Sequence, residues 1–281
     1  MKNILLPTDF SKNSLNAIDY AMNLLQNESC NFYLVNVQTA SSFISDDIMS
    51  ASVSTSIYNT LIGASKKSVN NIISIVKEEY NNEKHNFFSV VDYDNFIDSI
   101  NQISENYNID LIIMGTKGAS GLEKALFGSN TVRVIQRCEV PVLAIPDGCV
   151  YEGLSTIAYT TNNLTLLVSK ALAVLNFIKQ LNNSKLNILH VADEHHIAHN
   201  QNNNVAFFKT YFSDTSHDYL DSNSRQIFNN VQNYIKDNNI KMLAMMSKKH
   251  SFLERLFTRH TVETFAFKIN IPFLVMHSQE A

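Results

Sequence analysis

The sequence predicts two tandem α/β units, each a doubly wound parallel sheet with helices on both faces. Two observations lead to this fold class. Short, almost wholly apolar runs alternate with longer segments whose apolar residues recur every three or four positions. The second half of the 281-residue chain also repeats the order of these segments. Alternating strands and helices with right-handed crossovers form doubly wound sheets.

Five apolar runs in the first half are predicted to be buried strands. Pro7 ends the first run, as expected for a residue that cannot donate a backbone hydrogen bond. Pro141 stands at the start of the last run, where a missing N–H group is tolerated. The five predicted strands cover residues 3–7, 32–37, 86–91, 109–114 and 141–145.

Helices are predicted between these strands. Ser11 is a plausible N-cap for the first helix, whose apolar face is formed by Leu15, Ile18, Met22 and Leu25. A serine-rich connection leads into a long helix that ends near Tyr80. A third helix covers residues 94–106, with inward-facing Phe96, Ile97, Ile100 and Ile103, and a fourth opens at Ser129.

The second half repeats the first: its opening segment, residues 155–163, matches residues 2–10, and its end matches the end of the first half at a shift of 131 positions. Residues 109–145 and 240–277 both contain an apolar strand, a polar loop, a helix with an LEKALF or LERLF motif, and a closing apolar strand after proline. Pro141 and Pro272 are 131 positions apart, as are Leu122 and Leu253. The repeat predicts a duplicated domain with units at residues 1–147 and 148–281.

The stretch 114-MGTKGASGLEKALFGSN-130 holds four of the seven glycines of the chain, Gly115, Gly118, Gly121 and Gly128. A glycine-rich turn between a strand and a helix lets backbone N–H groups approach an anion, helped by the helix N-terminus. Ser129 stands where its hydroxyl can cap the helix and contact a phosphate. Glycines that serve only turns and caps are the alternative.

The internal repeat favours a ligand. At the shift of 131, Met246, Lys249 and Phe252 stand where the first half has Gly115, Gly118 and Gly121. Asn162 stands at the position of Asp9. Since the second half makes the same connection without glycine, we expect the glycines of the first half to serve a bound phosphate group.

The loop resembles that of the universal stress protein family, whose ATP-binding members carry the pattern G-x2-G-x9-G-[ST]. Gly115, Gly118, Gly128 and Ser129 match this pattern, and 6-LPTDFS-11 is similar to the opening motif of the family. The resemblance implies a five-stranded flavodoxin-like sheet of the adenine-nucleotide-hydrolase-like type in each unit. It also implies a nucleotide bound across the carboxyl ends of strands one and four.

The resemblance also implies roles for single residues. Pro7, Thr8 and Asp9 would flank the adenosine, and Val37 would offer backbone groups to the adenine edge. Met114 and Gly115 would line the ribose side. The phosphates of ATP, or of ADP or AMP, would be held by Gly118, Gly128, Ser129 and Asn130. Asp9 would lie near the ribose and is the candidate contact for Mg²⁺; a turn or cap role is its alternative.

The resemblance further implies that the closing strands, 141–145 and 272–277, meet at their edges and make the two halves an intramolecular pseudo-dimer. A further homodimer and an unknown protein partner stay open. Three functions are expected in this order: an ATP-binding regulatory protein, a weak ATPase or nucleotidyl or phosphoryl transferase, and a nucleotide-free scaffold. No arrangement of nucleophile, base or paired carboxylates predicts catalysis.

Composition excludes other classes. A net charge of −4 offers no basic surface for nucleic acid, and no apolar run is long enough to span a membrane. Three distant cysteines without a CxxC pair predict reduced thiols and a cytoplasmic location.

Two further clusters of polar residues are candidate sites. His195 and His199, with Asp193 and Glu194, have the spacing of metal ligands but stand beside a long polar stretch, which favours solvated side chains. The basic residues Lys248, Lys249, Arg255 and Arg259 could bind an anion, although a remnant of the first loop is the preferred interpretation.

Overall fold

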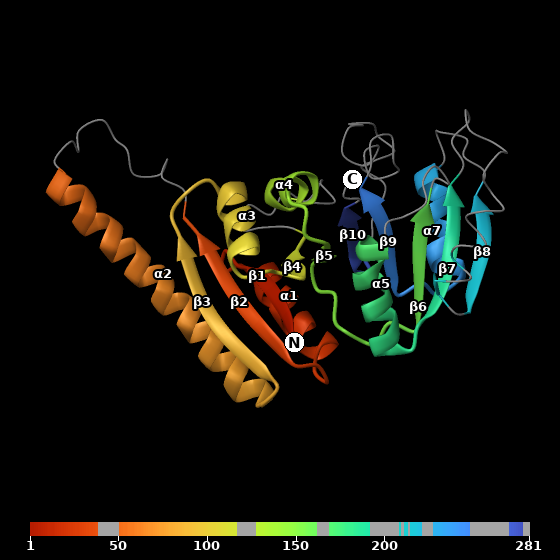
Figure 1. The fold of residues 1–281 in the computed structure, drawn as a ribbon, viewed down its shortest axis with the longest axis horizontal. Helices are drawn as coiled ribbons and strands as arrows, with labels where there is room; N and C mark the ends of the chain where they lie inside the picture. Colours follow the sequence, from red (N-terminus) through yellow and green to blue (C-terminus); the bar gives the residue numbers. More distant parts are fainter. Residues whose placement is uncertain are drawn as a thin grey trace.

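The computed structural model describes residues 1–38, 51–116, 128–161, 169–191, 208, 211–212, 214–220, 227–247 and 270–277. Its strands form one ten-stranded sheet that runs through both halves of the chain (Figure 1). Among the helices described, none is long and apolar enough to cross a membrane.

Within its described residues, the first half contains five strands and four helices, in the predicted alternation. The strands are β1 (Lys2–Pro7), β2 (Cys30–Val37), β3 (His85–Asp92), β4 (Leu111–Gly115) and β5 (Val142–Ile145). The helices are α1 (Lys12–Leu24), α2 (Ala51–Tyr80), α3 (Phe96–Asn106) and α4 (Ser129–Arg137). All five apolar runs noted in the sequence therefore form strands.

The described residues of the second half also form five strands. They are β6 (Thr156–Thr161), β7 (Lys185–Val191), β8 (Thr215–Leu220), β9 (Met242–Ser247) and β10 (Phe273–His277). Its described helices are α5 (Ser169–Asn182) and α7 (Ile227–Asp237). The predicted boundary between residues 147 and 148 lies in the connection from β5 to β6, where Gly148 and Gly153 have positive φ angles of 68° and 84°.

The strand order is β3-β2-β1-β4-β5-β10-β9-β6-β7-β8. Every neighbouring pair is parallel except β5 and β10, which pair antiparallel with Leu143 opposite Leu274. The two closing strands thus join the halves, and β3 and β8 form the outer edges (Figure 1). In each half the order reverses direction beside the first strand, between β1 and β4 and between β6 and β9.

Two apolar cores lie on opposite faces of the sheet because successive strand residues point to opposite sides. On one face Ile4 and Leu6 pack with α1, α2 and α5. On the other face Leu5 packs with α3, α4 and α7. Since both faces are covered by helices, inner strands such as β4 and β5 read as nearly continuous apolar runs in the sequence.

The strand register agrees with the shift found in the sequence. Val142 of β5 lies opposite Ile112 of β4, and Phe273 of β10 lies opposite Leu243 of β9. Both residues of the second pair stand 131 positions beyond their counterparts. The repeat is therefore a repeat of strand pairing as well as of sequence.

Helix starts follow the local capping chemistry. Ser11 caps α1, as predicted, because its hydroxyl accepts a hydrogen bond from the Ser14 N–H group. The helix predicted from residue 94 begins at Phe96, since the Asn95 side chain accepts from the Ile97 N–H group at 3.0 Å and acts as the N-cap. Short polar side chains thus determine where both helices begin.

Candidate functional site

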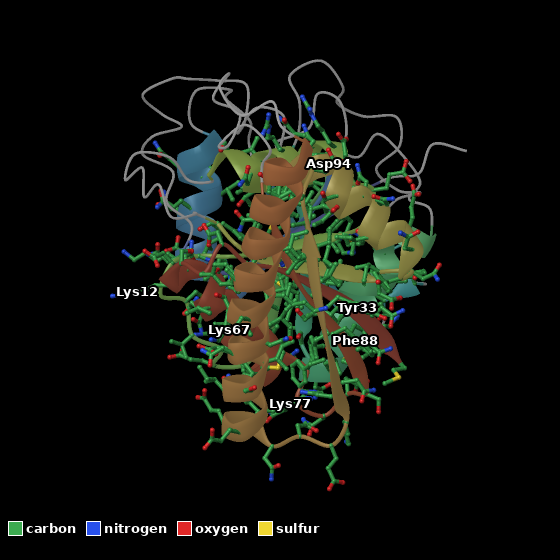
Figure 2. The ribbon with its side chains drawn as sticks, turned by 90° about the vertical axis from the view of Figure 1, so that its left-hand side faces the viewer. Lys12, Tyr33, Lys67, Lys77, Phe88 and Asp94 are labelled. Carbon is green, nitrogen blue, oxygen red and sulfur yellow. The ribbon has the colours of Figure 1, made fainter. Side chains whose placement is uncertain are left out.

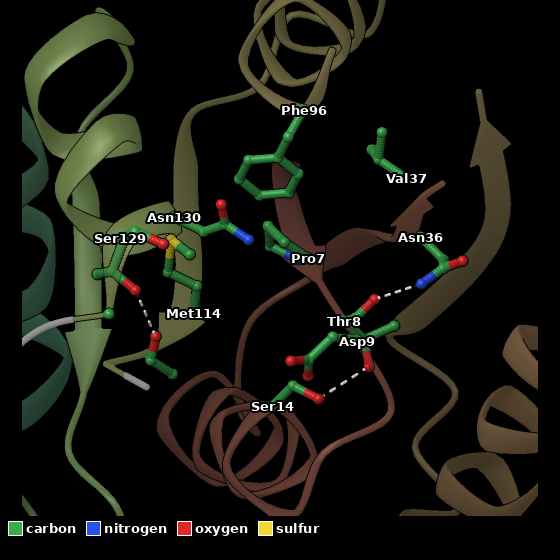
Figure 3. A pocket seen from close by; sticks show the side chains of 13 residues that line it. Pro7, Thr8, Asp9, Ser14, Asn36, Val37, Phe96, Met114, Ser129 and Asn130 are labelled. Carbon is green, nitrogen blue, oxygen red and sulfur yellow. Dashed lines mark hydrogen bonds between the residues drawn. The ribbon is translucent and has the colours of Figure 1, made fainter. Parts of the chain in front are cut away.

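A cleft of about 270 Å³ opens at the carboxyl ends of β1, β2 and β4, where the strand order reverses (Figure 3). It lies beside the N-termini of α1, α3 and α4. Ligands of open α/β sheets bind at this kind of position. The lining residues are Pro7, Thr8, Asp9, Ser14, Asn36, Val37, Phe96, Met114, Gly115, Gly128, Ser129, Asn130 and Thr131.

Nine of the ten residues predicted for the nucleotide site line this one cleft, although the sequence separates them by more than a hundred positions. The tenth, Gly118, lies outside the described residues, as do Lys117 and Gly121. The parallel sheet explains this convergence, because the carboxyl ends of its strands meet at one edge of the sheet.

The turn from β1 to α1 is held by buried hydrogen bonds. Thr8 is 6% exposed, and its Oγ1 lies 2.9 Å from Ser14 Oγ and accepts from the Phe10 N–H group at 3.0 Å. The Thr8 carbonyl accepts from Asn36 Nδ2 at 2.7 Å (Figure 3). The hydroxyl of Thr8 therefore organises the turn.

Asp9 lies at the exposed side of this turn. Its Oδ1 accepts from the Ser11 N–H group at 3.1 Å, the contact of an Asx turn. Phe10 follows with a positive φ of 64°, which is unusual for an aromatic residue. Asp9 thus has the turn role weighed from the sequence, while its carboxylate also lines the cleft.

The opposite wall is the N-terminus of α4. The N-cap of α4 is Gly128, which has extended backbone angles of −67° and 159°, and no side chain caps the helix. The prediction that the Ser129 hydroxyl caps α4 is wrong, because Ser129 is already the first helical residue. Ser129 and Asn130 are exposed at the cleft. An N-terminus without a side-chain cap offers N–H groups and positive potential to an anion.

Thr131 ties α4 to the end of β4. Its Oγ1 donates to the Gly115 carbonyl at 2.9 Å, and the Gly128 N–H group donates to the Thr116 carbonyl. Thr131 is 2% exposed, so its hydrogen bond to the Gly115 carbonyl is shielded from water. The start of α4 is therefore held directly above the strand end on which Met114 and Gly115 stand.

Gly115 has a packing reason of its own. A Cβ atom at this position would lie 2.9 Å from both Cγ and the carbonyl oxygen of Asn13 in α1. Only glycine allows α1 to approach β4 so closely. From the repeat we inferred that the glycines of the first half serve a ligand, because the second half lacks them. This inference does not apply to Gly115, because helix packing explains why it has no side chain.

Four lining residues were not predicted from the sequence: Ser14, Asn36, Phe96 and Thr131. Phe96 was expected in the core, but it is half-buried and its ring faces the cleft above Pro7 (Figure 3). Asn36 is 3% exposed and accepts from Gln38 Nε2, which also contacts Ser65 Oγ of α2 at 3.1 Å. Asn36 thus links α2 to the β1–α1 turn.

The second half has different side chains at the equivalent strand positions. Met246, 7% exposed, stands at the position of Gly115, and the register of β6 and β7 places His190 at that of Asn36. His190 Nε2 lies 3.1 Å from His217 Nδ1 and its ring stacks on Tyr219. Burial, and then the charge of His217, lowers the pKa of His190 to about 4.

The described residues provide no ready metal centre. Within them, no group of three or more His, Cys, Asp or Glu side chains could hold a metal ion. His195, His199, Asp193 and Glu194 lie outside this part of the chain, as do Lys248, Lys249, Arg255 and Arg259. A Mg²⁺ ion at Asp9 would therefore need oxygen ligands from water or a bound phosphate.

A doubly wound parallel sheet with a cleft at the reversal of strand order defines an α/β protein of the doubly wound class, in which ligands bind at this position. The sequence model of the universal stress protein family matches residues 1–146, just over half of the chain. The chain therefore belongs to the universal stress protein family.

Similar proteins cover both the first half and the whole fold. A universal stress protein of Methanocaldococcus jannaschii is 29% identical over 145 residues, 51% of this chain and 81% of that protein. The crystal structure of a universal stress protein from Archaeoglobus fulgidus covers 99% of this chain and 97% of its own, at 18% identity and a TM-score of 0.70. A putative universal stress protein from Pseudomonas aeruginosa covers 99% and 94%, at 12% identity and 0.59. The two structural likenesses extend over both halves and support the fold.

Proposed function

We propose that the unit formed by residues 1–147 binds an adenine nucleotide, ATP or its ADP or AMP form, in the cleft between β1 and α4. The observation that carries the proposal is the convergence on one cleft of nine residues that the family resemblance implied. Phosphates would lie at the N-terminus of α4, against Gly128, Ser129 and Asn130. Pro7, Val37, Met114 and Phe96 provide an apolar surface that suits a purine base (Figure 3).

The polar wall of the cleft suits a ribose and its phosphates. Asp9 offers a carboxylate that could accept ribose hydroxyls or contact a phosphate-bound Mg²⁺ ion. Gly118 would extend the phosphate-binding backbone.

The role we propose is regulatory: nucleotide occupancy would change a surface that another protein recognises, in a cytoplasmic setting. The three cysteines fit that setting as free thiols, and burial raises the pKa of Cys149 to about 11.

The second unit, residues 148–281, is proposed to serve architecture and pairing. Met246 adds a buried side chain where the first half has no side chain at all, and His190 replaces the amide of Asn36. We therefore expect one nucleotide per chain. Isothermal titration of the full chain with ATP and Mg²⁺ would measure this stoichiometry, and two equivalent sites would contradict the asymmetry.

The first experiment is to denature freshly purified protein and identify any released nucleotide by chromatography. The same preparation of Gly118→Val should lose it, because branched Cβ substituents obstruct phosphate approach. Asp9→Ala should weaken ATP binding by about tenfold or more, from the loss of charged hydrogen bonds. Asp94→Ala is the matched control, since Asp94 also accepts a turn N–H group but lies outside the cleft.

Three outcomes separate the candidate functions. Nucleotide binding that depends on Asp9 and Gly118, without turnover, supports the regulatory protein. Steady ATP turnover that Asp9→Ala abolishes while binding survives would favour a weak ATPase or transferase. Protein without nucleotide, and without a thermal shift in ATP and Mg²⁺, would favour a scaffold and overturn the proposal.

A further inference from the structure

A groove of about 890 Å³ runs between α1 and α2, on the face of the sheet that these helices cover. Phe10 and Leu15 contribute from the side of α1, and Ile72 and Ile75 from α2. Ile75 is 52% exposed and lines this hollow surface. The groove is distinct from the nucleotide cleft, because no residue lines both.

The two ends of the groove carry opposite charges. Asp19 and Glu79 stand together at one end, and among the described residues neither has an ion-pair partner. Partial burial, and then the negative charge of Glu79, raises the pKa of Asp19. Lys67 lines the other end, about 18 Å away along α2 at the rise of a helix. Lys12, the first residue of α1, lies on the same side of the molecule as Lys67 (Figure 2).

We infer that this groove is a docking site for an amphipathic helix of a partner protein. The apolar face of that helix would cover Ile72 and Ile75, and a Lys or Arg would lie against Asp19 and Glu79. The walls are helices, so they offer side chains and no strand edge, which suits a helix in the groove rather than an added strand. Charge complementarity determines which end of the partner helix is basic.

A second copy of this chain is a poorer occupant than such a partner. The exposed side of α2 around Ile75 carries Ser68, Asn71 and Ser74. Among residues 62–80 of α2, Ile75 is the one large apolar side chain that is exposed. Two α2 helices packed together would therefore bury little apolar surface.

The groove shares the β1–α1 turn with the nucleotide cleft. Phe10 lines the groove, while Thr8 and Asp9, immediately before it, line the cleft. The Phe10 N–H group donates to Thr8 Oγ1, and Phe10 has the positive φ of 64°. Because Asp9 and Phe10 are neighbours in this turn, we expect a ligand that moves Asp9 to move the Phe10 wall of the groove as well. This link rests on the proposed nucleotide binding, whereas the groove itself does not.

The test uses a fluorescein-labelled synthetic amphipathic helix of about 18 residues, long enough to span Lys67 to Glu79. It has leucines on one face, lysines at one end and glutamates at the other. The control peptide has glutamates in place of the lysines. Fluorescence anisotropy with the full chain should show micromolar binding of the lysine peptide and at least tenfold weaker binding of the control.

Variants of the chain locate the binding. Ile75→Glu should weaken binding of the lysine peptide at least tenfold, and Asp19→Asn with Glu79→Gln severalfold. Val150→Glu is the matched control, because Val150 is 71% exposed and outside the groove. Since Ile75 is also exposed, Ile75→Glu should keep the circular dichroism spectrum and the nucleotide affinity of the wild type.

Equal binding of both peptides, no binding, or binding that Ile75→Glu leaves intact would overturn the docking site. Sedimentation that reveals a dimer which Ile75→Glu dissociates would replace the partner helix with a second copy. Adding ATP and Mg²⁺ should change the peptide affinity at least threefold. An unchanged affinity in protein that binds ATP would overturn the link through Phe10, whereas absent ATP binding would count against the proposed function instead.

Discussion

Replacing Gly115 with alanine tests how closely α1 packs on β4. The new Cβ atom would lie 2.9 Å from the Asn13 carbonyl oxygen, well inside van der Waals contact. A backbone oxygen in the first turn of α1 cannot rotate away, so the helix or the strand end must shift. Overpacking of this kind costs about 1–3 kcal/mol of unfolding free energy.

Urea denaturation of nucleotide-free wild type and Gly115→Ala measures this change in unfolding free energy. An equal slope of the two transitions would show that the shift in midpoint reports stability alone. Gly63→Ala is the matched control, because Gly63 lies in α2 and a Cβ atom there would meet nothing within 4 Å. That variant should gain about 0.5–1 kcal/mol from helix propensity. If Gly115→Ala is as stable as the wild type, the close approach of α1 does not require glycine.

Three further predictions use the same denaturation assay. Burial lowers the pKa of His190 from 6.5 to about 4, so the native state binds fewer protons than the unfolded chain between these pH values. The free energy of unfolding should therefore fall by roughly 3 kcal/mol as the pH drops from 6.5 to 4. His190→Asn should remove this contribution to the pH dependence of stability. Asn36→Leu should lose about 1–3 kcal/mol, because the buried Thr8 carbonyl loses its 2.7 Å donor; an unchanged midpoint would show that this bond is dispensable. Lys2→Ala should lose less than about 1 kcal/mol, because the 3.3 Å Lys2–Asp110 ion pair is more than a third exposed on both sides; a larger loss would mean that its contact with the Phe177 ring is the stronger term.

Periodicity in the sequence was sufficient to predict the five strands of the first half and the starts of α1 and α4, whereas β8, with the polar sequence TSHDYL, was not predicted. Apolar runs ended by proline, and caps such as Ser11, are local signals that tertiary packing does not override here. The internal repeat predicted the duplicated domain, and the structure adds that both halves share the same strand register. Element order and the convergence of Asp9 and Ser129 follow from parallel pairing.

Contacts between elements that are far apart in the sequence could not be predicted from periodicity. The close approach of Gly115 and Asn13 involves residues 102 positions apart, and no local sequence pattern predicts it. Thr131 and Asn36 did leave a weak signal. Thr131 shares a helix face with buried Val134 and Ile135, and Asn36 follows Phe32 and Leu34 on one strand face. A polar residue that continues an apolar stripe at the carboxyl end of a sheet is a candidate lining residue.

The antiparallel pairing of β5 with β10 joins two halves of one chain, so this pairing does not depend on protein concentration. Two separate chains joined at such strands would dissociate on dilution, whereas here the connection from Pro146 to Ser155 keeps the partner strand permanently within reach. Because both halves belong to one chain, they also need not have the same sequence. In a symmetric pair each side chain appears twice, but in one chain Gly115 and Met246 can occupy matching positions. Covalent linkage thus permits a division of labour that a homodimer cannot have.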